Sequence, residues 1–377
     1  MTFVKRVKSA AVVVLLAGGS LGLTGLAANA SANSPVANSA YRQTNLVSDI
    51  PGLARHTDPN LRNSWGTSTG PGLPIWVADN HAGAATLYDG QGNPQPGPGS
   101  RQLVVTIPAP RSAGPGAAGA PDGTVFNPTP DGFLVSRHGV SAPARFLFAT
   151  EDGIIAGWSP AADTTHAIMA VDNSINNAIY KGLALGAGGS GQLLYAADFH
   201  NGKIDVFDGT FAPATVSGGF MDTTLPAGFA PFGIQAIGGD VYVTYAMQDA
   251  DAEDEVAGKG LGYVDLYDAN GNLLRRIASR GDLNAPWGVA LAPASFGALG
   301  SSLLIGNFGD GRINAFDAFR GVPLGGLLDA DRKPIQIDGL WGIAFGNGLL
   351  NQPTNTLFFA AGPNDEADGL YGRIDAQ

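Results

Sequence analysis

A two-strand unit that recurs along the chain constrains the fold more than any other feature of the sequence. The unit is clearest at 193–208, where alternating apolar residues precede and follow an Asn-Gly turn. Related stretches occur at 76–89, 148–158 and 304–317. Each stretch predicts a β-hairpin, so their recurrence predicts a repeat architecture built from short strands.

A glycine near the start of each copy marks the repeat, and the spacing of these glycines gives its period. The six glycines are Gly66, Gly123, Gly182, Gly233, Gly288 and Gly342. The last four follow one another at 51, 55 and 54 residues. Self-similarity at this period, with four short strands per copy, is typical of a β-propeller, in which each blade packs against its neighbours. The sequence therefore predicts an all-β fold, a six-bladed β-propeller.

The way the ring closes can also be predicted. The last repeat ends at 369–375, the equivalent of a third strand, so its outermost strand is missing. The apolar and polar residues of 41–47 precede the first repeat and can supply that strand, which would close the ring. We therefore expect one propeller domain over 41–377, preceded by a polar linker over 31–40.

The pattern of residues at the N-terminus predicts that the protein is exported from the cytoplasm. Basic residues at 5–8 precede an apolar run that ends in a small-x-small site at 28–30, as in a secretory signal peptide covering 1–30. The chain contains no cysteine and no later apolar segment long enough to span a bilayer. We expect a secreted or periplasmic protein that does not insert into the membrane after the signal peptide is cleaved.

The net negative charge of the chain restricts the classes of partner that it can bind. Cleavage would remove three basic residues and no acid, which takes the net charge from −11 to −14. Such a surface repels polyanions, so nucleic acid and anionic membranes are not expected partners. A cation, a small molecule, a glycan or a protein is compatible with this charge.

Several motifs resemble a known family. The pattern Ala-Asp-x-x-x-Gly-x-Ile-x-Val-Phe-Asp at 197–208 is similar to the NHL-type repeat. Longer runs at 231–239, 245–251, 306–316 and 337–341 resemble a poorly characterised family of secreted bacterial NHL-like six-bladed β-propeller proteins. The resemblance covers roughly the whole mature chain. It implies the fold and the compartment, and it brings no assigned activity.

Polar residues at the turns between second and third strands form the first candidate site. These turns and the blade-joining loops fall on one face of a propeller, where we place Asp79, His81, Asp198, His200, Asn307 and Asp310. Carboxylates, amides and imidazoles around one mouth can bind a ligand or a metal. Alternatively, Asp and Asn at a strand end accept hydrogen bonds from the turn backbone.

Aromatic residues form a second candidate feature. Trp65, Trp287 and Trp341 each precede the repeat glycine of an innermost strand and should therefore crowd the axis. They can form an apolar floor on which a ligand or a sugar stacks, or they can pack between the blades.

Two acidic turns form a candidate metal site. Asp249, Asp251 and Glu253 lie in one turn, and Asn364 and Asp365 lie in the matching turn of the last repeat. Clustered oxygen ligands suit calcium, although the spacing does not fit an EF-hand. A solvated acidic loop is the alternative.

Two functions of different classes are compatible with these features. The first is a secreted module that binds a small molecule, a glycan or a protein on its loop face. The second is a calcium-dependent hydrolase or lyase of the six-bladed propeller type, with a cation in the axial channel.

Overall fold

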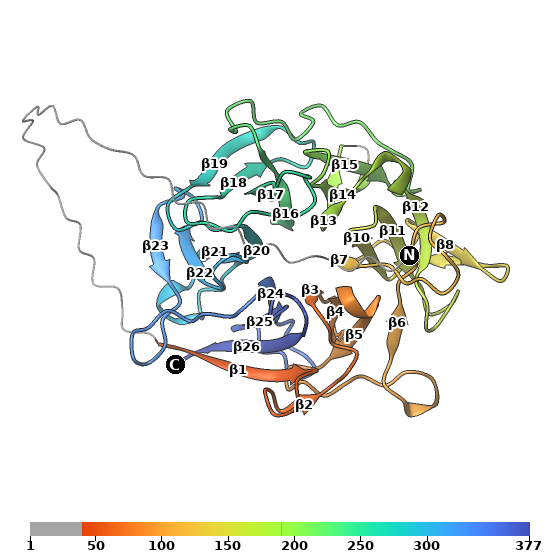
Figure 1. Ribbon diagram of the computed structural model, residues 1–377, viewed down its shortest axis with the longest axis horizontal. Helices are drawn as coiled ribbons and strands as arrows, with labels where there is room; N and C mark the ends of the chain where they lie inside the picture. The colour runs from red at the N-terminus through yellow and green to blue at the C-terminus, as the bar shows by residue number, and fades with distance from the viewer. Residues whose placement is uncertain (1–39, 190) are drawn as a thin grey trace, which may run out of the picture. The chain divides into compact units, whose positions relative to one another are not determined.

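The computed structural model describes residues 40–189 and 191–377, so the expected signal peptide and nearly all of the expected linker lie outside the described residues. The described strands form six small sheets arranged as the blades of a propeller (Figure 1). Their innermost strands contact one another in chain order, and the last returns to the first. The predicted all-β, six-bladed fold is confirmed. No helix of the described residues is long and apolar enough to cross a membrane.

The first three blades are formed by the following strands. Blade 1 contains β3 (Ser64–Ser68), β4 (Ile75–Asp79), β5 (Ala84–Tyr88) and β6 (Val104–Thr106). Blade 2 contains β7 (Pro121–Phe126), β10 (Phe146–Thr150), β11 (Ile154–Trp158) and β12 (Ile168–Asp172), with a separate hairpin of β8 (Leu134–Arg137) and β9 (Val140–Pro143). Blade 3 contains β13 (Tyr180–Gly188), β14 (Gly191–Asp198) and β15 (Lys203–Asp208).

The other three blades complete the ring. Blade 4 contains β16 (Phe229–Ile237), β17 (Asp240–Met247), β18 (Tyr263–Tyr267) and β19 (Leu273–Ser279). Blade 5 contains β20 (Pro286–Leu291), β21 (Ser302–Asn307), β22 (Ile313–Asp317) and β23 (Pro323–Gly326). Blade 6 contains β24 (Leu340–Phe345), β25 (Thr356–Ala361), β26 (Leu370–Ala376), β1 (Tyr41–Ser48) and the short β2 (His56–Thr57). Short 3-10 helices are η1 (Asn80–Ala82), η2 (Pro98–Ser100), η3 (Ser174–Asn176) and η4 (Gly297–Leu299).

The antiparallel pairing within the blades defines two faces of the ring. The innermost strand of each blade begins opposite the end of the second strand, as in the pairs Tyr180 with Asp198 and Leu340 with Ala361. We call this side, which also carries the turns between second and third strands, the top face. The side where the innermost strands end is the bottom face.

The repeat glycines allow the innermost strands to approach one another closely. A Cβ atom at Gly182 would lie 3.0 Å from the carbonyl oxygen of Phe232 in the next blade. At Gly288 and Gly342 it would lie 2.6 Å from the backbone oxygen of the neighbouring strand. A side chain at these positions would push the strands apart. The glycine repeat is therefore a packing requirement of a narrow ring.

Apolar clusters lie between the blades. Six clusters of buried side chains each join two neighbouring blades, and a seventh lies on the axis. This arrangement follows from the alternation of the strands, because the two faces of each blade pack against different neighbours.

Strand β1 closes the ring as predicted. It pairs antiparallel with β26, and Leu46 and Val47 are fully buried between blades 6 and 1. The Tyr41 hydroxyl donates to the carbonyl oxygen of Phe296 at 3.0 Å and accepts from the backbone N–H of Leu299 at 3.0 Å. The N-terminal strand therefore connects blade 6 to both of its neighbours.

Candidate functional site

The predicted aspartates of the top face hold the turns together. Asp79 is fully buried and accepts hydrogen bonds from the hydroxyls of Ser64 at 2.9 Å and Thr86 at 2.7 Å. Asp198 is also fully buried, and it accepts from the side-chain amide of Asn201 at 2.8 Å. Burial raises the pKa of both carboxyls, although these hydrogen bonds oppose the rise. Their contacts match the structural role of an aspartate at a strand end.

The remaining polar members of this predicted set lie in three different blades. His81 is exposed in η1 of blade 1, whereas the Nδ1 atom of His200 in blade 3 lies 3.2 Å from the carbonyl oxygen of Ala252. In blade 5, the amide of Asn307 donates to Asp310 at 3.0 Å. Among residues 40–189 and 191–377, no three His, Cys, Asp or Glu side chains are placed to hold a metal ion.

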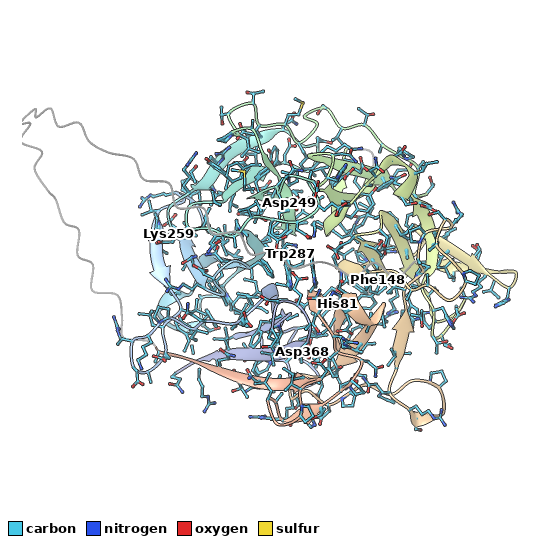
Figure 2. The ribbon with its side chains drawn as sticks, viewed as in Figure 1. His81, Phe148, Asp249, Lys259, Trp287 and Asp368 are labelled. Atoms are coloured by element: carbon cyan, nitrogen blue, oxygen red, sulfur yellow. The ribbon has the colours of Figure 1, made fainter. Side chains whose placement is uncertain are left out.

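The predicted tryptophans fill the axis near the top face. The rings of Trp65 and Trp341 stack with their centroids 3.6 Å apart, and Trp287 meets Trp341 edge-on at 5.8 Å. Figure 2 places Trp287 near the centre of the ring. Phe232 and Phe308 pack against Trp341 at 5.6 Å and 4.1 Å. Since Trp65 and Trp341 are buried, this aromatic plug is part of the core.

A buried lysine completes the plug. The Lys181 side chain is 1% exposed, and its Nζ lies 2.6 Å from Glu151 and 3.3 Å from Asp254. Nζ also lies 5.1 Å from the centre of the Trp65 ring. Burial lowers the pKa of Lys181, but the carboxylates of Glu151, Glu255 and Asp254 more than offset this effect and raise it. An ammonium group therefore lies between these carboxylates and the tryptophan rings.

Two further carboxyls border the lysine. Burial raises the pKa of Asp122 well above its ordinary value, and the charge of Glu151 raises it further, although the Gly123 N–H opposes the rise. Burial also raises the pKa of Glu255 to about 8, with Lys181 opposing the rise. Perturbed acids of this kind are common at functional sites and in structural ion-pair networks. Here they belong to the network that closes the top of the axis.

Raising the pH from about 5 to about 9 is expected to lower the melting temperature, in part through Glu255. Because its pKa of about 8 lies above the ordinary value of 4.5, the folded state keeps a proton that the unfolded state has lost. This stabilisation is complete below about pH 4.5 and is lost as the pH rises through about 8. Thermal melts should show a flatter pH dependence for Glu255→Gln. Parallel pH profiles for the two proteins would contradict this assignment.

The predicted calcium ligands belong to two separate loops. Asp249 accepts the backbone N–H of Glu253 at 3.0 Å, and its loop, which also carries Asp251, ties back to the axis through Asp254. The side-chain amide of Asn364, next to Asp365, donates to Asp368 at 2.8 Å. These contacts shape the loops. Calcium binding remains a prediction from the sequence.

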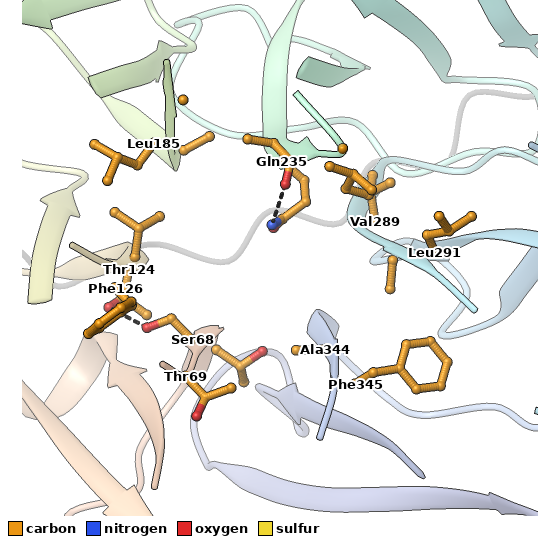
Figure 3. Close-up of a pocket in the computed structure, with 18 of the residues that line it drawn as sticks. Ser68, Thr69, Thr124, Phe126, Leu185, Gln235, Val289, Leu291, Ala344 and Phe345 are labelled. Atoms are coloured by element: carbon orange, nitrogen blue, oxygen red, sulfur yellow. Dashed lines mark hydrogen bonds between the residues drawn. The ribbon is translucent and has the colours of Figure 1, made fainter. Parts of the chain in front are cut away.

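A cavity of about 610 Å³ opens on the axis at the bottom face (Figure 3). Its wall is built from the ends of all six innermost strands, β3, β7, β13, β16, β20 and β24. Toward the top face it narrows to a neck of about 20 Å³, which is lined by four of the repeat glycines and Trp287. Such a neck holds about one water molecule. The axis is therefore a blind funnel that is open below and plugged above.

None of the described residues that line the cavity has a charged side chain. Blades 1 and 2 contribute the hydroxyls of Thr67, Ser68, Thr69 and Thr124, and blade 4 contributes the amide of Gln235. The remaining wall is mainly apolar and includes Leu185, Val289, Leu291, Ile343 and Phe345. Exposed apolar side chains also surround the bottom face, at Leu134, Leu274, Phe319, Val322 and Leu349.

Sequence reasoning missed both the buried lysine and the cavity. The signal for Lys181 was its position before a repeat glycine, where four of the other five copies have Trp or Phe. The signal for the cavity was the group of hydroxyl and amide residues just after the repeat glycines, such as Thr67 and Gln235.

Two curated relatives match most of the chain, whereas no protein-family model matches it. An uncharacterised protein of Acanthamoeba polyphaga mimivirus is 33% identical over 336 residues, which are 87% of this chain and 78% of the relative. A second uncharacterised protein of the same virus is 32% identical over 339 residues, 87% of this chain and 84% of the relative. Neither name describes an activity.

Solved structures share the fold at low sequence identity. The soluble aldose sugar dehydrogenase of Escherichia coli in its apo form aligns with a TM-score of 0.52 at 13% identity, over 89% of this chain and 100% of that chain. The PQQ-bound aldose sugar dehydrogenase of Streptomyces coelicolor aligns with a TM-score of 0.51 at 11% identity, over 90% and 99%. At such identities the likeness shows the propeller fold alone.

Proposed function

This chain belongs to the same family as the two uncharacterised mimivirus proteins, and we propose that it is a binding module that holds a small molecule in the axial cavity of its bottom face. The single observation that carries the proposal is the funnel of about 610 Å³ at the ends of the six innermost strands. This volume lies within the range of about 300–1,000 Å³ that is common for small-molecule sites.

A comparison of the two faces supports this choice. At the top face the axis is filled by stacked indoles and the Lys181 ion pairs, and the aspartates of the predicted ring are buried in turn hydrogen bonds. At the bottom face the strand ends leave an open, mostly apolar concavity with a few polar groups. Binding sites for small molecules combine these two properties. The proposed site therefore lies on the face opposite the one that the sequence favoured.

The alternative, a calcium-dependent hydrolase or lyase, receives less support from the axial residues. Such an enzyme needs a cation on the axis to polarise a carbonyl or phosphoryl oxygen. In this chain the Lys181 ammonium already lies among the axial carboxylates of Glu151 and Asp254. Among the described residues that line the bottom cavity there is no carboxylate and no imidazole to serve as a general acid or base.

We place the binding of the proposed ligand outside the cytoplasm. Residues 1–30 have the charge, apolar run and small residues of a secretory signal peptide, which supports a secreted or periplasmic location. A glycan or a protein bound on the top face is the competing hypothesis, and the test below includes it.

Titration with N-phenylnaphthylamine, an uncharged fluorescent probe, tests the proposal. We expect saturable binding that Gln235→Trp weakens at least about tenfold, because the indole would occupy the cavity. Gln235 is exposed and lines the cavity, so the larger side chain should not disturb the core. Gln91→Trp, in an exposed bottom-face turn away from the cavity, is the matched control and should bind normally. Binding that survives Gln235→Trp but is lost in His200→Ala would place the site on the top face.

A further inference from the structure

Polar groups line two opposite edges of the axial cavity. Blades 1 and 4 face each other across the ring, because each is three blades from the other in either direction. Figure 3 shows Gln235 of blade 4 pointing into the opening, across from Ser68 and Thr69 of blade 1. The walls between these edges are mostly apolar on blades 3, 5 and 6. From this arrangement we propose that the ligand is an uncharged molecule with a rigid apolar body and a hydroxyl or carbonyl group at each of two opposite ends.

The described lining residues, all of them uncharged, favour an uncharged ligand. A charged group that leaves water needs a counter-charge or several strong hydrogen bonds, and the described part of the lining provides no counter-charge. The chain as a whole has a net charge of −11, which also disfavours an anionic ligand. An uncharged molecule avoids both the desolvation of a charge and the repulsion by the negative chain.

The first polar edge has a hydroxyl that lacks a partner. Thr67 lines both the cavity and its neck, and its Oγ1 atom is buried without a hydrogen bond from any described residue. By contrast, the hydroxyls of Ser68 and Thr124 bond to each other at 3.1 Å, and Thr69 donates to the carbonyl oxygen of Leu73 at 2.9 Å. Since buried polar groups are normally paired, a ligand oxygen at the entrance of the neck, toward which the Thr67 side chain would turn, is a suitable partner for this hydroxyl.

The second polar edge is the amide of Gln235. Its side chain is exposed, and its Nε2 atom lies 3.5 Å from the carbonyl oxygen of Ala236, at the limit of a hydrogen bond. A primary amide can donate to and accept from the same ligand. It therefore suits either a hydroxyl or a carbonyl group.

This inference rests on the proposed function, and three related probes test it separately. Naphthalene, 2-naphthol and 2,6-dihydroxynaphthalene share one flat apolar body and carry no, one or two hydroxyls at its ends. Competition against N-phenylnaphthylamine measures their affinities. We expect each hydroxyl to tighten binding by about three- to tenfold, the usual effect of one neutral hydrogen bond.

Two variants assign the hydroxyls to the two edges. Gln235→Leu, which keeps the size of the side chain, should remove the gain from the second hydroxyl while naphthalene still binds. Thr67→Val should remove the gain from the other hydroxyl. It should also leave the melting temperature equal or higher, because it deletes an unpaired buried hydroxyl. A merely structural threonine would lose stability and leave the probe series unchanged.

The possible results separate this inference from the proposed function. Equal affinities across the three probes, with N-phenylnaphthylamine still blocked by Gln235→Trp, would overturn the two polar edges and leave the cavity site intact. Equal binding of the anilinonaphthalene sulfonate analogue at high salt, where long-range repulsion is screened, would overturn the uncharged class. Failure of Gln235→Trp to affect any probe would overturn the proposed function itself.

Discussion

A chain that begins at Asp49 is expected to unfold far below the melting temperature of a chain that begins at Ala40. The shortening removes β1, which buries Tyr41, Leu46 and Val47 and supplies the pairing partner of β26. Loss of these three buried side chains alone costs roughly 5–9 kcal/mol. For a domain of this size, that corresponds to a fall of at least about 7 °C. Thermal melts of the two purified chains measure the difference.

A peptide that covers residues 40–48 provides the control. If β1 acts as the closing strand of blade 6, the peptide added to the shortened chain should restore part of the lost melting temperature. The two chains melting within about a degree of each other would show that β1 does not hold the ring closed.

The Lys181→Met variant is expected to lose on the order of 3–5 kcal/mol of folding free energy, because it leaves the largely buried Glu151 carboxylate and the partly exposed Asp254 carboxylate without their cation. Methionine keeps the length and the apolar stem of lysine, so the loss should arise from the missing charge. Adding Glu151→Gln to this variant should recover much of the stability, since Glu151 Oε1 lies 2.6 Å from the Lys181 Nζ. Chemical denaturation of the wild type and both variants measures the effect.

Lys259→Met is the matched control. Lys259 Nζ lies 3.2 Å from a carboxylate, that of Asp282, but both side chains are exposed, the lysine to 81%. An exposed pair of this kind is worth at most about 1 kcal/mol. Equal losses in Lys181→Met and Lys259→Met would show that the axial lysine is not a buried ion-pair partner.

The architecture was predictable because local signals and ring geometry agree. The Asn-Gly turn at 201–202 and the alternation around it mark a hairpin, and the repeat glycines mark the strands that approach the axis. The pairing of β1 with β26 was predictable for a similar reason, because the last repeat lacks a strand that 41–47 can supply. These features repeat, so each copy supports the interpretation of the others.

The position of the cavity was not predictable from the sequence, because it depends on how side-chain volume is distributed along the axis. The residues before the repeat glycines include Trp65, Trp287 and Trp341, and their rings together fill the upper axis. Smaller residues such as Thr67 and Ala344 follow the glycines, and the axis below them remains open. The alternation of apolar and polar residues identifies strands. It does not show at which end of the ring the side chains fill the axis.

The most direct test of the proposed site is a crystal structure of the protein soaked with 2,6-dihydroxynaphthalene. We predict ligand density in the bottom cavity, with one hydroxyl at the Gln235 amide and the other at Thr67 Oγ1. Density for the ligand on the top face, beside Asp198 and His200, or an empty cavity in crystals whose bottom face is open to solvent, would contradict the proposed site.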